Sequence, residues 1–402
     1  MIDRAGTTPA VPALRIGLLW HSLASGNLGV GALTLANMAI ARDVAARMGF
    51  RPEFVVLGMR DTGPALAVPA DVSAVAIDTR ALLSPAGYLA RIGQLDCILD
   101  IGAGDSFADI YGAKRFGFLW LSKMLPALRG VPVLLSPQTI GPFTKPLYRR
   151  LAAIALGRAR AVVARDEQSL AVAKALAPQT PARLSVDVAF ELPFVNQSER
   201  RGGPVRRIGI NASGLLFSEA LSGRNRFGLS VDYARFTRDL IGALLARGDC
   251  EVHLIAHATS AGDPGDDDGH RADALAAEFP GTIRVPDFAG PSEAKSYISG
   301  LDLLVAGRMH ACIGAFSSGT PVVPVAYSRK FSGLFGLLGY EAMIPVTGMT
   351  TDAATAFVLD AIERRDALAA AEQAGMARVA GLLDAYRELL AALFTEVAGK
   401  RR

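Results

Sequence analysis

The chain has 402 residues, of which 51% are hydrophobic and 20% are charged, a composition that excludes collagen-like and intrinsically disordered proteins. Its 42 Lys and Arg residues against 38 Asp and Glu residues give a net charge of +4. So small an excess does not indicate a nucleic-acid-binding protein, but it suits an anionic small molecule or an anionic membrane surface. The length predicts about two to three domains.

The three cysteines, Cys97, Cys250 and Cys312, lie far apart and in no C-x-x-C spacing, so no disulfide framework is expected. The N-terminus, with Asp3 and Arg4, lacks the pattern of a cleavable signal peptide. No window reaches about eighteen uninterrupted apolar residues, so we predict no transmembrane helix. These features predict a soluble protein of a reducing compartment, the cytoplasm.

Short apolar segments rich in branched residues alternate with longer Ala- and Leu-rich segments in the first part of the chain. Strands that are apolar on both faces and alternate with helices indicate a parallel sheet covered by helices on both sides. We therefore expect an α/β fold, with residues 14–195 as a first Rossmann-like domain. Its predicted strands are 15–20, 53–58, 97–101, 131–136 and 161–164, and its predicted helices include 31–48 and 169–176.

A polar, glycine-containing linker is predicted at residues 196–205, and the alternation then resumes in a second Rossmann-like domain at residues 205–350. The tail 351–402 is predicted to be helical, with a break near Gly375. The acidic segment 262–270 lacks the spacing of a calcium loop and is predicted to be a solvated loop before a helix. The predicted strands of the second domain are 207–211, 251–255, 282–285, 303–306 and 322–326, and its helices include 236–247 and 270–278.

Glycine-rich or polar segments follow three predicted strands of the first domain. Ligands of open α/β sheets bind beyond the carboxyl ends of the strands, where glycines allow close approach and helix N-termini offer free N–H groups. We predict that the acceptor side of a binding site lies here, with an ordinary helix cap as the alternative for the Asp and Ser residues. The candidate residues are Asn27, Gly29, Gly104, Asp105, Ser106 and Gln138.

Cations and one histidine follow other strands at the corresponding edges. Arg165 follows the strand 161–164, Arg308 and His310 follow 303–306, and Arg329 and Lys330 follow 322–326. Arg holds a carboxylate or phosphate in a planar fork, Lys acts as a point charge, and His can move a proton near neutral pH. Together they predict a cleft between the domains for a small, multiply charged anion. A surface ion pair is the alternative for Arg165, and a packing role is the alternative for His310.

The segments at these strand ends resemble the polysaccharide pyruvyl transferases. They stand in the order of that family between residues 15 and 340, and the last segment, with its R-x-H, G-x-P and Y-x-x-K patterns, is the most specific. The matching segments are NLG (27–29), DIGAGDSFADIYG (100–112), SPQTIGPF (136–143), ARDEQS (164–169), DVAF (187–190) and GRMHACIGAFSSGTPVVPVAYSRKFSGL (307–334).

The resemblance implies a two-domain fold like that of the GT-B glycosyltransferases and transfer of pyruvate, as a ketal, from phosphoenolpyruvate to a sugar. Phosphoenolpyruvate is then a co-substrate, and neither a cofactor nor a metal is expected. The acceptor is a sugar of a polysaccharide or of its lipid-linked precursor, which implies a cytoplasmic enzyme that contacts the inner face of the membrane without spanning it. No nucleic-acid partner is expected.

In that family an Arg, a His and a Lys are implicated in activity, and they correspond to Arg165, His310 and Lys330. We predict these three as catalytic residues and Arg308, Arg165, Lys330 and Arg329 as donor-binding residues. The chain departs from the family at Val30, where an acid is usual, and at Ala103, where the usual residue is Gly. The departure at Val30 concerns recognition of the acceptor.

Two other functions fit the same residues. A GT-B glycosyltransferase would place Arg308 and Lys330 on the diphosphate of a nucleotide sugar and use Asp105 as the base. A non-catalytic sugar- or anion-binding protein would use the same cleft without turnover. Phosphate release from phosphoenolpyruvate, compared with nucleotide release from nucleotide sugars, distinguishes the three.

Overall fold

The computed structural model describes residues 11–400 apart from 62 and 261, and the side chains of these residues apart from Pro264 and Arg329. The N-terminal residues on which the signal-peptide prediction rests lie outside the described part of the chain. Two separate sheets are present, and the segment 196–205 lies between them, with a single short 3₁₀ turn, η3 (Ser198–Arg200).

The first sheet has seven strands in the order β3-β2-β1-β4-β5-β6-β7, and its paired strands run parallel. The two edge strands, β3 and β7, were not predicted, because their residues are largely exposed or half-buried and carry no continuous apolar run. The strands are β1 (Ala13–Leu19), β2 (Arg51–Gly58), β3 (Val72–Ala76), β4 (Cys97–Asp100), β5 (Val133–Gln138), β6 (Ala161–Ala164) and β7 (Ala182–Leu184).

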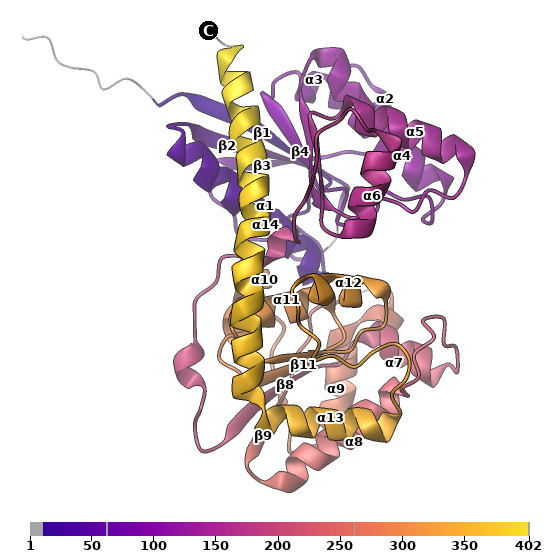
Figure 1. The fold of residues 1–402 in the computed structure, drawn as a ribbon, viewed down its shortest axis with the longest axis vertical. Coiled ribbons are helices and arrows are strands. Elements are labelled where there is room, and N and C mark those ends of the chain that lie inside the picture. The colour runs from indigo at the N-terminus through magenta and orange to yellow at the C-terminus, as the bar shows by residue number, and fades with distance from the viewer. Residues whose placement is uncertain (1–10, 62, 261, 401–402) are drawn as a thin grey trace, which may run out of the picture.

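The second sheet has five parallel strands in the order β10-β9-β8-β11-β12. All five were predicted, with bounds that differ by at most two residues. They are β8 (Arg206–Asn211), β9 (Cys250–Leu254), β10 (Ile283–Arg284), β11 (Leu303–Ala306) and β12 (Val322–Pro324). Two parallel sheets covered by helices confirm the predicted α/β class (Figure 1).

Helices connect the successive strands of each sheet, except β2 and β3, between which the described residues form a loop. In the first domain they are α1 (Leu28–Arg47), α2 (Thr79–Leu83), α3 (Tyr88–Ile92), α4 (Ala113–Met124), α5 (Pro146–Arg158) and α6 (Glu167–Leu176), with 3₁₀ turns η1 (Leu125–Arg129) and η2 (Val188–Glu191). In the second they are α7 (Gly214–Leu221), α8 (Tyr233–Arg247), α9 (Asp268–Glu278), α10 (Pro291–Ile298), α11 (Met309–Ser317) and α12 (Arg329–Leu337), with η4 (Pro264–Asp266).

The C-terminal tail forms two helices, α13 (Thr351–Glu363) and α14 (Arg365–Gly399). The predicted break near Gly375 is wrong, because the chain bends at Arg364 and α14 runs unbroken through Gly375. Gly375 instead allows α14 to approach α11, since a Cβ there would overlap the ring of Phe316. Helix α13 packs on α8 of the second domain, and α14 returns along the first (Figure 1).

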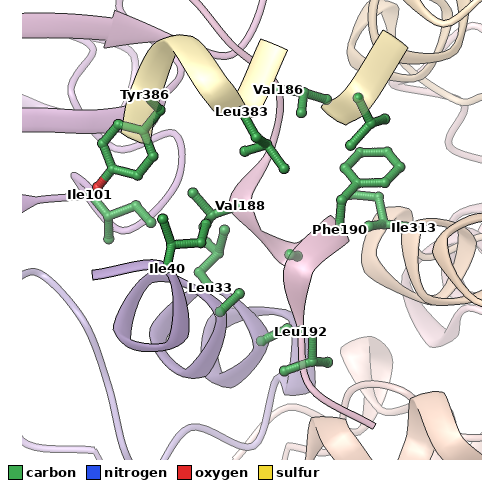
Figure 2. Packing of buried hydrophobic residues seen from close by; sticks show 14 of the residues in the cluster. Leu33, Ile40, Ile101, Val186, Val188, Phe190, Leu192, Ile313, Leu383 and Tyr386 are labelled. Carbon is green, nitrogen blue, oxygen red and sulfur yellow. The ribbon is translucent and has the colours of Figure 1, made fainter. Parts of the chain in front are cut away.

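One hydrophobic cluster is shared by the two domains. The segment that leaves the first sheet places Val188 and Phe190 between α1 and α14 on one side and α11 on the other (Figure 2). Leu33 of α1 and Leu383 of α14 belong to the same cluster. Because buried apolar area is a main source of stability, this shared core holds the two domains in a fixed relation around the cleft between them.

Helix α1 alone among the described helices is long and apolar enough to cross a membrane. It is mostly buried inside the protein, where it packs against β2, α10, α11 and α14. Its apolar character is therefore accounted for by its position in the core.

A buried polar network fixes α14 to the first domain. The Tyr386 hydroxyl donates to Oδ1 of Asn37 at 2.7 Å and lies 2.8 Å from Oγ of Ser136. Tyr386→Phe is expected to lower the free energy of unfolding by about 1–3 kcal/mol, because it leaves buried polar atoms without a partner. Urea titration measures the loss. Tyr148→Phe, at a half-buried ring whose hydroxyl has no hydrogen-bond partner among the described residues, is the control, and an equal loss in both variants contradicts the assignment.

Candidate active site

A cleft of about 840 Å³ opens between the two domains. The first domain contributes the loops after β4, β5 and β6, and the second contributes the beginning of α11 and one side of α12 along its length. This is the edge at which parallel strands end and helices begin, as expected for an open α/β sheet. Among the polar residues of the lining are Asp105, Tyr111, Thr139, Arg165, Asp187, Ser328 and Lys330.

His310 lies in the first turn of α11, directly behind the lining residue Met309. Its side chain is 21% exposed, and its Nε2 lies 3.8 Å from Oδ2 of Asp187. No hydrogen-bond partner of Nε2 is found in the described chain. Burial lowers the pKa of His310, Asp187 opposes that change, and Arg165 adds to it. The ring thus lies beside charged groups of the other domain, and its buried Nε2 forms no hydrogen bond with them.

Gly29 explains how the two domains meet at this histidine. A Cβ at position 29 would overlap Nδ1 of His310, so only a glycine lets the start of α1 lie against the ring. Two backbone hydrogen bonds hold this loop to the second domain: Leu28 N–H donates to His257 at 3.1 Å, and Thr259 N–H donates to Gly26 at 2.9 Å.

Arg165 follows β6 and turns its guanidinium toward His310 and the cleft. Its Nη1 donates to Oδ2 of Asp187 at 2.7 Å and its Nε donates to Oγ1 of Thr139 at 2.9 Å. The side chain is 14% exposed and that of Asp187 is 2% exposed. The buried carboxylate of Asp187 and the hydroxyl of Thr139 therefore hold the guanidinium of Arg165 in one orientation.

Lys330 of α12 forms an ion pair with Asp105 of the loop after β4, across the cleft. The same carboxylate accepts a hydrogen bond of 2.9 Å from the Tyr111 hydroxyl. Burial raises the pKa of Asp105, but Lys330 and Arg165 outweigh burial and the net pKa lies below its ordinary value. Asp105 is thus a carboxylate near neutral pH, and it faces Lys330 from the other domain.

The arrangement brings two cations and two carboxylates to one cleft, with one histidine beside it. Comparisons with known proteins identify the family of the chain. A sequence model described as "Polysaccharide pyruvyl transferase" matches residues 39–329. The chain belongs to the polysaccharide pyruvyl transferase family.

A curated relative is the amylovoran biosynthesis protein AmsJ of Erwinia amylovora, 24% identical over 270 residues. The match covers 63% of this chain and 62% of AmsJ.

Solved structures with the same fold include an α,α-trehalose-phosphate synthase (UDP-forming) of Burkholderia vietnamiensis, with a TM-score of 0.54 and 10% identity, covering 96% of this chain and 100% of that chain. Another is Anabaena Alr3699/HepE with UDP and glucose, with a TM-score of 0.51 and 12% identity, covering 96% of this chain and 99% of that chain. At these identities the likeness concerns the fold alone, which is GT-B-like as the sequence predicted.

Arg308, in the R-x-H segment of this pyruvyl transferase family member, does not reach the cleft in this structure. Its Nη2 donates to Asp268 at 2.7 Å and to Asp266 at 2.6 Å, and the side chain is 11% exposed. Asp268 is itself fully buried and also accepts from the backbone N–H groups of His257 and Gly214. The predicted donor-binding role of Arg308 is therefore not supported by its position, because both carboxylates already occupy its guanidinium.

The same contacts correct the prediction for the acidic segment 262–270. Asp267 caps α9 through the His270 N–H at 2.9 Å, as a loop before a helix would. Asp268, however, is buried and holds Arg308 and the loop after β8 in place. The segment is thus part of the interior of the second domain and not only a solvated loop.

Two predicted acceptor residues are buried away from the cleft. Gln138 is the last residue of β5, which extends two residues beyond the predicted strand end. Its amide donates to the backbone oxygens of Asp100 at 2.6 Å and Ser136 at 3.2 Å. Ser106 is 1% exposed and accepts from Arg115 at 2.5 Å. Both side chains hold the loop after β4 in its shape, because each bonds a group within or beside that loop.

The other predicted acceptor residues shape the loops at the cleft. Asn27 is exposed but caps α1, since its Oδ1 accepts from the Gly29 N–H at 2.9 Å. Gly104 has a φ of +82° and lies beside Arg165. Ala103, where this family usually has Gly, has a φ of +50°, a conformation that favours glycine. The loop therefore keeps the glycine-type backbone despite the side chain.

Arg329 begins α12, and its side chain lies outside the described part of the structure. Three lining residues, Tyr111, Thr139 and Asp187, were not predicted from the sequence. Each stands inside a segment that matched the family, but neither residue type nor spacing separated it from its neighbours. Among the described residues, no three His, Cys, Asp or Glu side chains cluster in a way that could hold a metal ion.

Buried histidines give this pyruvyl transferase a predictable acid sensitivity. Burial lowers the pKa of His21 and His257 to about 3 and that of His253 to about 4. The unfolded chain, with pKa values near 6.5, binds more protons below that pH. The free energy of unfolding is therefore expected to be highest above about pH 6.5 and to fall by up to about 1.4 kcal/mol per histidine for each pH unit down to about pH 4.

Urea titrations at about pH 7 and about pH 5 measure this loss. His270 is exposed, so His270→Asn is expected to leave the difference between the two conditions unchanged. A protein equally stable at both pH values contradicts the prediction.

Proposed function

We propose that the protein transfers a pyruvyl group from phosphoenolpyruvate to two hydroxyls of one sugar and closes a cyclic ketal. The observation that carries the proposal is that Arg165 and Lys330 line one interdomain cleft and His310 lies directly beside it, in a chain of the polysaccharide pyruvyl transferase family. One group that can move a proton and two fixed cations are what a donor with a carboxylate and a phosphate requires.

Donor binding gives each of the two cations an additional anionic partner. In this structure Arg165 pairs with Asp187 and Lys330 pairs with Asp105. A donor that carries two acidic groups offers each cation a further anionic partner. Helices α11 and α12 add free N–H groups, since neither has a side-chain cap and both begin in the lining, at Met309 and beside Ser328.

The transfer begins when His310 donates a proton to the methylene carbon of phosphoenolpyruvate, which makes C2 electrophilic. A sugar hydroxyl then bonds to C2 and returns its proton to His310, and the C2–O bond to phosphate breaks with both electrons leaving on the phosphate. A second hydroxyl of the same sugar bonds to C2 and closes the ketal, and its proton goes to the departing phosphate. The cations stabilise the departing phosphate, and Asp105 accepts a hydrogen bond from the sugar hydroxyl.

The acceptor belongs to polysaccharide synthesis, as the family description and the relative AmsJ support. We propose a sugar of a polysaccharide or of its lipid-linked precursor. Since phosphoenolpyruvate is a product of central metabolism, the proposed reaction takes place in the cytoplasm.

The test measures phosphate release from phosphoenolpyruvate with a panel of p-nitrophenyl hexosides that keep both the 4- and 6-hydroxyls free. We expect release that depends on the acceptor, with a mass gain of one pyruvyl ketal on the hexoside. Parallel reactions contain UDP-sugars in place of phosphoenolpyruvate. Nucleotide release in these, without phosphate release from phosphoenolpyruvate, assigns the cleft to a glycosyltransferase. Calorimetric binding of either donor without turnover on any acceptor assigns a binding protein.

A further inference from the structure

Positive charge is concentrated in one part of the first domain. Residues 110–164 contain nine Lys and Arg residues and no Asp or Glu, although the whole chain carries only +4. The rest of the protein is therefore slightly acidic. Lys123 is buried against Asp100, and the other eight cations are exposed. Of these eight, Arg160 alone forms an ion pair among the described residues, with Glu396.

Large apolar side chains stand exposed among these cations. Leu147 is 63% exposed and Ile154 is 47% exposed, both on α5. Leu147, Arg150, Ile154 and Arg158 are spaced at i, i+3, i+7 and i+11, which places them on one side of the helix. The opposite side of α5, with Ala152, Ala155 and Leu156, packs into the domain. The outer side of α5 is thus a stripe in which aliphatic and basic side chains alternate.

Helix α4 extends this surface toward the cleft. It packs beside α5 through the Trp120 Nε1–H, which donates to the Leu151 oxygen at 2.8 Å, and through the rings of Phe116 and Tyr148, 4.6 Å apart (Figure 1). Ile110 and Tyr111, just before α4, are 61% and 41% exposed and also line the cleft. We name the outer surface of α5 with the exposed start of α4 the basic apolar face, and it reaches the mouth of the cleft. Its remaining cations are Lys114, Arg115, Lys145 and Arg149.

We propose that the basic apolar face binds the surface of an anionic phospholipid bilayer. Unpaired cations without intervening acids attract anionic headgroups, and exposed aliphatic side chains beside them insert at the boundary between headgroups and acyl chains. A nucleic acid or another soluble polyanion would bind the cations but leave Leu147 and Ile154 in water. A bilayer contacts both the basic and the aliphatic side chains of this face. Docking through this face brings Ile110 and Tyr111, and with them the cleft mouth, to the membrane.

The benefit of bringing the cleft to the membrane rests on the proposed function. A sugar acceptor carried on a membrane lipid would meet the cleft without leaving the bilayer surface. Binding to the bilayer itself needs neither phosphoenolpyruvate nor an acceptor, so the vesicle experiment fails or succeeds independently of the proposed transfer.

The experiment is co-sedimentation of the full chain with vesicles of phosphatidylcholine alone and of phosphatidylcholine with phosphatidylglycerol. We expect binding to the anionic vesicles, weakened by added salt, and little binding to the zwitterionic ones. Arg149→Glu/Arg150→Glu is expected to weaken binding at least about twentyfold, because it replaces two attractive charges with repulsive ones. Leu147→Ser/Ile154→Ser is expected to weaken binding without changing the charge.

The matched control is Arg364→Glu/Arg365→Glu, an adjacent arginine pair at the α13–α14 junction, far from α5 (Figure 1). It makes the same change in net charge and is expected to bind vesicles as the wild type does. Phosphate release with a water-soluble hexoside is expected to be unchanged in the α5 variants.

Equal loss in the control, or no binding to anionic vesicles, overturns the proposal. So does capture by soluble heparin with binding insensitive to Leu147→Ser/Ile154→Ser, which assigns the face to a polyanion.

Discussion

Replacing His310 with alanine is expected to lower kcat by about 10²–10⁴-fold, the usual contribution of a positioned general acid, and to leave the fold intact. The side chain is 21% exposed, and its Nε2 has no hydrogen-bond partner in the described chain. The substitution therefore breaks no hydrogen bond of that atom. The proposed proton transfer to the methylene carbon of the donor is what the alanine variant loses.

The pH dependence separates this role from a packing role. Burial lowers the pKa of His310, whereas a bound donor with a phosphate and a carboxylate would favour the imidazolium and raise the pKa again. If protonated His310 is the acid, both kcat/KM and kcat fall as pH rises. The fall in kcat has the higher midpoint pH, because kcat reports the donor-bound enzyme and kcat/KM the free enzyme. The alanine variant is expected to lose both transitions.

Steady-state kinetics with phosphoenolpyruvate on folded protein decides the matter. His270→Ala, at an exposed histidine of the same domain, is the matched control and is expected to keep the wild-type rate. Gly29→Ala provides a second route, since its Cβ would displace the ring of His310 and should lower kcat without removing the histidine. Near wild-type turnover in His310→Ala shows that the assignment is wrong and moves the search for the acid to the residues around Asp105.

The second large effect is expected at Arg165. Arg165→Ala removes the proposed charge-assisted contact to the donor, worth about 1.5–3 kcal/mol, so the KM for phosphoenolpyruvate should rise about ten- to a hundredfold. It also leaves the carboxylate of Asp187, which is 2% exposed, without its partner. Some loss of stability is therefore expected as well, and a thermal melt must accompany the kinetics.

Lys330→Ala should weaken donor binding by a similar factor, and Lys330→Arg should not restore it, because a planar fork does not replace a point charge. Arg183→Ala, at an exposed arginine of β7, is the matched control. Direct calorimetry with phosphoenolpyruvate separates binding from turnover. If Arg165→Ala and Lys330→Ala change affinity no more than Arg183→Ala, both cations are surface charges of the usual small effect, below about 1 kcal/mol.

Sequence patterns alone determined much of the fold. The buried strands are recognisable in the sequence as continuous apolar runs, because both faces of a parallel sheet are covered. The strands β6 and β11 have the predicted bounds. The exposed edge strands β3 and β7 carry no such run and were missed. The position of the tail was equally open, because Gly375 looks like a break in sequence and only its contact with Phe316 shows a helix–helix approach.

The candidate site divides in the same way. The rule that ligands bind where strands end, together with residue type, pointed to Arg165, Asp105, His310 and Lys330. Those residues lie at or directly beside one cleft. Arg308 follows the same rule and the same strand as His310, yet two carboxylates bind it inside the second domain. Position along the chain could not separate the two, because a shift of two residues at a helix start turns the side chain to another neighbour.

Only the tertiary structure shows which charged residues far apart in the sequence form ion pairs. Asp187 lies 22 residues from Arg165 and faces His310 from the other domain, and Asp105 meets Lys330 across 225 residues. A sequence pattern records what each residue is and which local element it enters. Which charges become paired, and therefore which remain free for a ligand, depends on how the two domains close on each other. That closure is set by the core that α1, α11 and α14 share.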